Sequence, residues 1–127
     1  MLTLYHYWSS VCSQKVRFCL AEKGLGWWVR HIDLFIFDHW QPDYLTLNPK
    51  AVVPTLDHDG DVLIESNVIV EYREDMFDGF SLSPDKPLAK ARIRLWLYNS
   101  ESIAHLSVNM ASYNPRHAPR LARFSKE

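Results

Sequence analysis

The sequence predicts an α/β domain with a four-stranded mixed sheet, followed by an incomplete all-α region. Three observations favour this class. Alternating residues at 2–7 and 27–34 flank a segment with helical spacing, which predicts a β-α-β unit. The turn residues Asp59 and Gly60 join two further strand-like segments into a hairpin, and a helical pattern follows it. The region 88–107 then contains neither proline nor glycine, as expected for a long helix.

The first strand and helix are indicated by residues 2–7 (LTLYHY), which alternate and favour β structure, and by the serines that follow. Ser10 or Ser13 can cap a helix, and the glycines of KGLG at 23–26 end it. Residues 27–34 (WWVRHIDL) alternate again, so the second strand lies parallel to the first through a right-handed crossover. The helix has apolar residues at a spacing of three and four, namely Val16, Cys19 and Leu20.

The second half of the domain begins with an irregular connection that we expect to hold a short helix around 42–47. Strands at 53–57 and 61–65 form the antiparallel hairpin. Ser66 then caps a helix that ends near Gly79. We expect three residues to line one face of this helix: Ile69, Tyr72 and Met76.

The domain organisation follows from these elements. Residues 1–79 form the α/β domain, 80–87 (FSLSPDKP) form a linker with two prolines, and 88–127 form the first helix and basic tail of a truncated helical region. One stripe of the long helix contains Leu88, Ala91, Leu95, Tyr98 and Ser102. We expect the tail arginines Arg116, Arg120 and Arg123 to belong to a solvated helix remnant.

Composition restricts the function classes. With 14 basic and 15 acidic residues the net charge is −1, which disfavours a nucleic-acid or membrane partner and favours a small molecule. The two cysteines form no CxxC pair, and the six histidines show no metal-ligand spacing, so we expect no metal site. No apolar run is long enough to span a membrane, and we expect a soluble, cytoplasmic protein.

The stretch SSVCSQKVR, residues 9–17, places small polar side chains where the first strand meets the first helix. A helix N-terminus has unpaired N–H groups and a positive dipole end, so it stabilises a thiolate or another anion. Ser10 is therefore a candidate donor to the thiolate of a ligand, and Cys12 is a candidate nucleophile. Simple capping by serine and burial of a lone cysteine remain the alternatives.

A second group of candidates lies in VVPTL and ES, further along the chain. Pro54 at the start of a strand, if cis, would expose the backbone of Val53 for pairing with a peptide. Glu65 and Ser66 lie where a strand meets the next helix. There Ser66 can hold a carboxylate while Glu65 accepts from an amine.

The chain resembles the cytosolic glutathione transferases over residues 2–106. Four segments in order carry the resemblance: SSVCSQKVRFCLAEKG, PDYLTLNPKAVVPTL, DGDVLIESNVIVEYRED and LSPDKPLAKARIRLWL. The resemblance implies a thioredoxin-like domain that binds glutathione as co-substrate, followed by a helical domain that supplies most of the site for a hydrophobic electrophile. It further implies a homodimer with a detoxifying transferase activity.

The same resemblance implies roles for individual residues. Ser10 takes the catalytic position that stabilises the glutathione thiolate, Val53 pairs with the cysteinyl backbone before a cis-Pro54, and Glu65 with Ser66 binds the γ-glutamyl end. The glycine carboxylate end is assigned to two other candidates, Lys50 and His39, and a solvated surface role explains either of them equally well.

Two alternatives remain open within this resemblance. The S-x-C-S spelling resembles the tetrachlorohydroquinone dehalogenases and zeta-class relatives, and other segments resemble bacterial β-etherases; a Cys12-based thiol-exchange or reductive lyase reaction is one alternative. A non-catalytic, dimerising remnant of a transferase is the other. The short helical region would leave a stripe including Leu95, Trp96 and Ile103 under-covered, as in a fragment, a truncated product or a self-associating chain.

Ala51 stands where the family usually has glycine, a modest change if φ there is negative.

Overall fold

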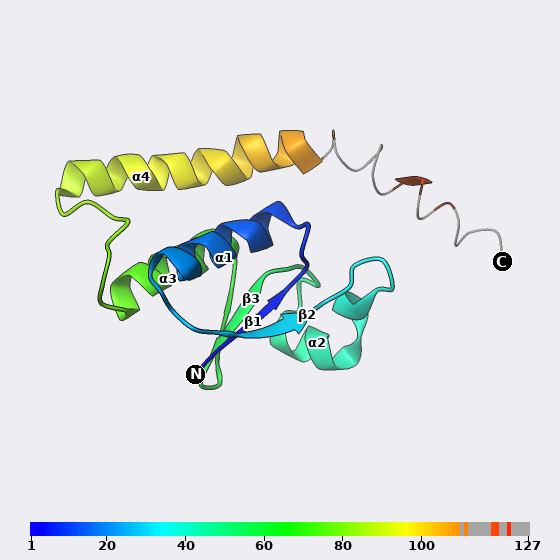
Figure 1. Cartoon of the computed structure of the whole chain (residues 1–127). Helices are drawn as coiled ribbons and strands as arrows, with labels where there is room; N and C mark the ends of the chain where they lie inside the picture. The colour runs from blue at the N-terminus through cyan, green and yellow to red at the C-terminus, as the bar shows by residue number, and fades with distance from the viewer. Residues whose placement is uncertain (110, 112–117, 120–121, 123–127) are drawn as a thin grey trace. The chain divides into compact units, whose positions relative to one another are not determined.

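The computed structural model describes residues 1–109, 111, 118–119 and 122, and divides the chain into two units, Met1–Leu82 and Ser83–Glu127 (Figure 1). The first unit contains β1 (Leu2–His6), α1 (Val11–Glu22), β2 (Trp28–His31), the 3₁₀ turn η1 (Asp38–Trp40), α2 (Pro42–Leu47), β3 (Thr55–His58), β4 (Asp61–Ile64) and α3 (Ser66–Met76). The predicted order βαβ followed by ββα is therefore confirmed.

The four strands form one mixed sheet in the order β2-β1-β3-β4. β2 is parallel to β1, with His6 opposite His31, while β3 is antiparallel to both β1 and β4. The long crossover through α1 makes the parallel pairing of β1 with β2 possible. The tight turn at Asp59 and Gly60 joins the antiparallel strands β3 and β4. The predicted four-stranded mixed sheet is confirmed.

Alternation along β1 assigns a layer of helix to each face of the sheet. Leu2 and Leu4 point to one face, where they join a buried apolar cluster completed by Val16 and Leu20 of α1, Leu56 of β3 and Ile69 of α3. Tyr5 points to the other face, and its ring centroid lies 6.1 Å from that of Tyr44 in α2. Figure 1 shows α1 and α3 together on one side of the strands.

The buried face of α3 differs from the prediction. Ile69 is buried as expected, but Met76 is 55% exposed and the charged Arg73 is only 1% exposed. The Arg73 guanidinium donates to the Cys19 carbonyl oxygen at 2.9 Å and to the Glu74 carboxylate at 2.5 Å. A buried arginine requires such partners, and apolar periodicity gives no sign of it.

Glu74 also holds the chain that leaves α3. Its Oε1 accepts from the Ser81 hydroxyl at 2.5 Å and from the Leu82 N–H at 3.1 Å. Burial opposes ionisation of Glu74, but these hydrogen bonds and the charges of Arg73 and Lys23 together hold its pKa below the ordinary value. The end of α3 and residues 81–82 are thus joined through one carboxylate.

Two predicted boundaries were wrong. The second strand ends at His31 instead of residue 34, because the Asp33 N–H donates to Asp38 Oδ2 at 2.9 Å and the chain turns away from the sheet. Ser66 was expected to cap α3, but it is the first helical residue and Glu65 holds the cap position. The other strand and helix ends differ from prediction by a few residues or fewer.

In the second unit, α4 (Pro87–Asn99) continues into a π-helical segment, η2 (Ser100–His105). The α-helical hydrogen-bond pattern that we predict over 88–107 is thus interrupted at Ser100–His105. Serine hydroxyls near the change donate back to main-chain oxygens: Ser100 to Leu97 and Ser102 to Tyr98, each at 2.8 Å. Such back-bonding bends helices and competes with regular turns.

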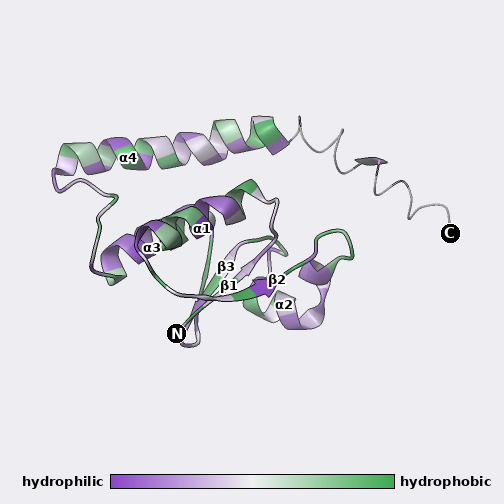
Figure 2. Cartoon of the chain, viewed as in Figure 1, coloured by the Kyte–Doolittle hydropathy of each residue, from purple (hydrophilic) through white to green (hydrophobic). Residues whose placement is uncertain are grey.

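Apolar residues of the second unit are largely exposed, as predicted for its under-covered stripe. Hydrophobic and hydrophilic residues alternate along α4 (Figure 2), and the Trp96 side chain is 75% exposed. None of the described helices is long and apolar enough to cross a membrane. The tail arginines Arg116, Arg120 and Arg123 lie outside the described residues, and the assignment of 80–87 as linker and 88–127 as a truncated region stays a prediction.

Candidate functional site

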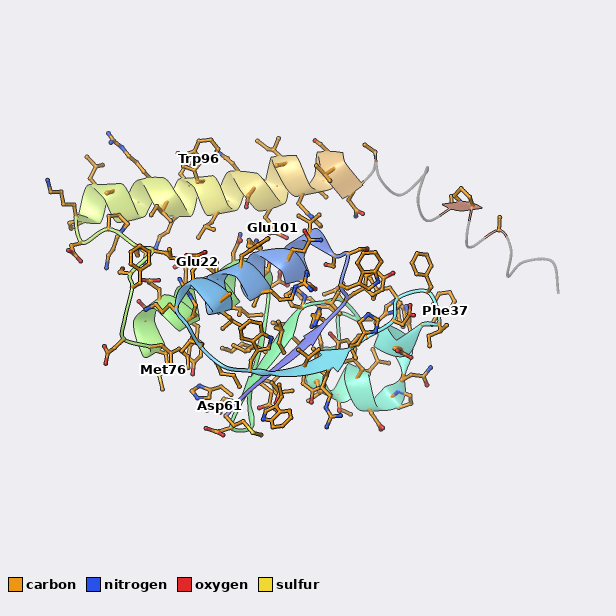
Figure 3. The ribbon with its side chains drawn as sticks, in the orientation of Figure 1. Glu22, Phe37, Asp61, Met76, Trp96 and Glu101 are labelled. Carbon is orange, nitrogen blue, oxygen red and sulfur yellow. The ribbon has the colours of Figure 1, made fainter. Side chains whose placement is uncertain are left out.

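The candidate residues gather at one edge of the sheet because of strand register. Tyr5 near the end of β1 pairs with Thr55 at the start of β3, and Thr55 pairs with Ile64 at the end of β4. The turn after β1, the segment before β3 and the junction after β4 therefore meet at this edge. The hairpin turn beside Asp61 and the loop at Phe37 mark opposite ends of the sheet in Figure 3.

Ser10 forms the N-cap of α1. Its hydroxyl oxygen accepts from the Ser13 N–H at 3.3 Å, which leaves the hydroxyl hydrogen available to donate outward. The turn that carries Ser10 is tied to α1, because the Trp8 carbonyl oxygen accepts from Arg17 at 3.1 Å and from Gln14 at 3.4 Å. A half-buried hydroxyl is thus held at the positive end of a helix.

The two cysteines differ in setting. Cys12 lies in the first turn of α1 and is half-buried, close in sequence to Ser10. Cys19 lies further along the helix, where burial raises the pKa of its thiol above the ordinary value. Burial therefore disfavours a Cys19 thiolate, and the role of Cys12 as candidate nucleophile stays a prediction.

A buried polar network holds the segment before β3. The Tyr44 hydroxyl donates to the Val52 carbonyl oxygen at 2.6 Å and lies 2.9 Å from Thr55 Oγ1. Asn48 Nδ2 donates to the same two oxygens at 2.9 and 3.0 Å. Tyr44, Asn48 and Thr55 are at most 4% exposed, and burial raises the pKa of Tyr44. The network thus holds the Val52 carbonyl oxygen, directly before Val53 and Pro54.

Val53 and Pro54 follow this network and are joined by a cis peptide bond. Among the described residues, no hydrogen bond uses the N–H or C=O of Val53, so its backbone is unpaired beside the start of β3. Ala51 has φ of 53°, so the condition under which alanine would be a modest change from glycine is not met. Its backbone adopts the left-handed conformation that favours glycine, and the methyl group is accommodated at a cost.

Glu65 and Ser66 form the third part of the site. Glu65 has φ of 71°, a strained value for a residue with a side chain. Ser66 is the first residue of α3 and only 4% exposed, and no described residue hydrogen-bonds to its hydroxyl. The Glu65 carboxylate pairs with Lys50, whose Nζ lies 2.6 Å from Oε1.

His39 stands apart from this group. It lies in η1, where its ring stacks with Phe37 at a centroid distance of 6.1 Å and is tilted against Trp40 at 5.9 Å. Burial lowers the pKa of His39, which favours the neutral imidazole. In the described part of the chain, no hydrogen bond or ion pair links His39 to the other candidate residues.

Sequence reasoning missed three supporting features of the site: the Tyr44, Asn48 and Thr55 network, the anchoring of the Ser10 turn by Arg17, and a bond between Lys15 and Asn67. Asn48 and Tyr44 fall in the quoted segment PDYLTLNPKAVVPTL. The available signal was the spacing of these polar residues, which places them on the buried side of a short helix. Such spacing gives no information about their hydrogen-bond partners.

The sheet order and the two helix N-termini at one edge define a thioredoxin-like domain. A family model described as glutathione S-transferase, N-terminal domain, matches residues 4–81. The chain belongs to the glutathione S-transferase family.

Individual relatives agree with this assignment. The chain is 38% identical over 95 residues to maleylacetoacetate isomerase of Rhizobium meliloti strain 1021, covering 75% of this chain and 45% of that protein. The crystal structure of beta-etherase LigF from Sphingobium sp. strain SYK-6 superposes with a TM-score of 0.84 at 34% identity, covering 88% of this chain and 47% of the other.

A glutathione transferase homologue from Sulfitobacter, solved with bound glutathione, superposes with a TM-score of 0.79 at 27% identity, covering 97% of this chain and 62% of that one. The chain spans less than half the length of the first curated relatives it matches. The thioredoxin-like fold class and the family are thus confirmed, while the activity of the whole protein is a matter for proposal.

Proposed function

We propose that this chain binds glutathione at the described sheet edge and uses Ser10 to keep the thiol ionised for attack on a small hydrophobic electrophile. The observation that carries the proposal is the register of β1, β3 and β4, which gathers the Ser10 turn, Val53 and Ser66 at one edge. Family membership supports the choice of ligand.

The chemistry of glutathione matches this edge group by group. Its γ-glutamyl carboxylate suits the Ser66 hydroxyl and the N-terminus of α3, and its ammonium suits the Glu65 carboxylate. Its cysteinyl peptide group can pair with the unpaired backbone of Val53. Its glycine carboxylate would lie toward a cation, for which Lys50 is the better candidate and His39 the weaker one.

The proposed role of Ser10 is electrostatic. Its hydroxyl donates to the sulfur and, with the positive end of α1, lowers the thiol pKa so that the proton passes to solvent. The thiolate lone pair then forms the sulfur–carbon bond, and the leaving group departs with the bonding electrons. Binding both reactants together contributes proximity. No metal takes part in this scheme.

Calorimetric titration of the full chain with glutathione tests the binding step. We expect heat at millimolar ligand, and a weaker affinity for Glu65→Gln. The matched control is Asp61→Asn, which neutralises an exposed acid at the other end of β4 and should leave the affinity unchanged. Absence of heat in the unaltered protein would refute the proposal.

A Cys12-based thiol-exchange or reductive reaction is a second candidate, favoured by the place of Cys12 in the first turn of α1. Ser10→Ala and Cys12→Ser separate the two. The first proposal expects Ser10→Ala to lose about 10²-fold or more in rate, while Cys12→Ser keeps the original rate. The second expects Cys12→Ser to lose its activity, while Ser10→Ala keeps it. Ser10→Ala also removes a helix cap worth about 1 kcal/mol, so Ser10→Thr, which keeps the cap and the hydroxyl, is the control.

We further propose a cytoplasmic homodimer with a detoxifying role, in which exposed apolar side chains of the second unit such as Trp96 and Ile103 are covered by association. Light scattering tests the dimer. Oligomers without any glutathione binding would instead support the non-catalytic remnant.

A further inference from the structure

A hydrogen bond joins the N-terminal halves of α1 and α3. The Lys15 ammonium in α1 donates to the side-chain oxygen of Asn67, the second residue of α3, and joins residues 52 apart in sequence. Asn67 directly follows Ser66. Lys15 lies in the helix that Ser10 caps, about 7.5 Å further along its axis for a rise of 1.5 Å per residue. The bond therefore connects the two helices beside the candidate site.

The pattern of contacts shows that α1 and α3 run in the same direction. Lys15 contacts Asn67 near the two N-termini, and Arg73 donates to the Cys19 carbonyl oxygen at 2.9 Å toward the two C-termini. Both helices thus present their N-terminal ends at the same edge. Val16, Leu20 and Ile69 fill the space between them with apolar contacts.

The choice of a lysine at this place requires an explanation. Apolar packing already joins the middle of the two helices, and Arg73 joins their far ends. A cation near a helix N-terminus interacts unfavourably with the helix dipole, so Lys15 does not stabilise α3 through its charge. What the bond with Asn67 adds is a fixed distance between the N-terminal halves of the two helices, beside the two points at which the ligand of the proposed function would be held.

We propose that Lys15 is a positioning residue that, through Asn67, holds the γ-glutamyl end of the site at the correct distance from the Ser10 end. This inference rests on the proposed function. A ligand that spans both ends, such as glutathione, depends on that distance. A ligand that lacks the γ-glutamyl group, such as cysteinylglycine, does not.

The test compares the two ligands on the full chain by calorimetry. Lys15→Met should raise the glutathione Kd about tenfold, the size expected for loss of one hydrogen bond to a charged group. Cysteinylglycine binding, measured in the millimolar range, should not change. Lys15→Arg, which keeps a cationic donor, should restore most of the glutathione affinity.

A double-mutant cycle identifies the route of the effect. Asn67→Ala should weaken glutathione binding as Lys15→Met does, and the double variant should be no weaker than either. Additive losses would mean that Lys15 acts as an independent charge, which overturns the inference. Should Lys15→Met fail to fold, Asn67→Ala tests the same bond.

Three further outcomes are decisive. If the unaltered chain binds glutathione and Lys15→Met binds it equally well, the inference alone is refuted. Equal weakening of both ligands would assign Lys15 a general structural role and would also refute it. If the unaltered chain binds neither ligand, the proposed function fails and this inference fails with it.

Discussion

The Lys50 ammonium lies 2.6 Å from the Glu65 carboxylate and links the loop before β3 to the N-cap of α3. Both side chains are substantially exposed, so the pair contributes only about 0 to 1 kcal/mol to stability. In the proposed function, the ammonium of glutathione approaches Glu65 while Lys50 turns to the glycine carboxylate.

Lys50→Met should therefore change binding more than stability. We expect a glutathione Kd several-fold higher and an unfolding free energy within about 0.5 kcal/mol of the original. γ-Glutamylcysteine, which lacks glycine, should bind the variant and the original alike. Calorimetry with both ligands checks this, and equal losses for the two would remove Lys50 from the glycine end.

The Tyr44 network should couple stability to binding. Tyr44→Phe removes the hydroxyl bonds to Val52 and Thr55 and should cost about 1 to 2 kcal/mol of unfolding free energy, measured by denaturant titration. Because Val53 follows Val52 directly, glutathione affinity should fall as well. The matched control is Tyr72→Phe, which loses a bond to His58 at the other end of the sheet and should leave affinity intact. Unchanged affinity in Tyr44→Phe would contradict this role of the network.

Ala51→Gly should stabilise the protein. Its φ of 53° costs a residue with a Cβ about 1 kcal/mol, more than glycine loses through its flexible unfolded chain. Chemical denaturation should show a gain of up to about 1 kcal/mol. Ala21→Gly, in α1, provides the opposite case and should lower stability. A loss at residue 51 equal to that at residue 21 would show that the left-handed backbone carries no strain.

Stability should fall below neutral pH through His6. This side chain is 4% exposed, and burial, together with the charge of Arg17, lowers its pKa below the ordinary value of 6.5. The unfolded chain therefore binds a proton before the folded chain does. The contribution of neutral His6 to the free energy of unfolding is therefore present above pH 6.5. It is lost as the pH falls toward the lower pKa that His6 has in the folded protein.

Thermal unfolding between about pH 7.5 and 5.5 measures this decline. His6→Gln should make the melting temperature less dependent on pH. His39, whose pKa burial also lowers, contributes in the same direction, so His39→Gln is needed to separate the two shares. A pH dependence that both variants leave unchanged would show that other groups are responsible.

Local patterns in the sequence predicted most of the first unit because its elements have strong local signals. Alternation at residues 2–7 and the Asp59–Gly60 turn determine strands and hairpin, and the serine before α1 determines a cap. Register then follows from which residues face the core. This register is what brings Ser10, Val53 and Ser66, which lie at strand ends, to one edge of the sheet.

What the sequence left undetermined depends on contacts between distant residues. Burial of Arg73 depends on the Cys19 carbonyl oxygen and on Glu74, and the bond between Lys15 and Asn67 joins two helices. The left-handed conformation of Ala51 is also a tertiary result, since local preference opposes it. Periodicity describes one element at a time and contains no information on such pairs.

The pairing of Leu4 with Leu56 and of Tyr5 with Thr55 has a consequence for how this domain tolerates change. If β1 slipped by one residue against β3, Tyr5 would replace Leu4 under α1 and the whole strand would turn over. Ser10 would be carried away from Val53 by the same slip. The core and the proposed site therefore depend on one alignment, so a substitution at Leu4 can disable the proposed reaction, whose groups it never touches.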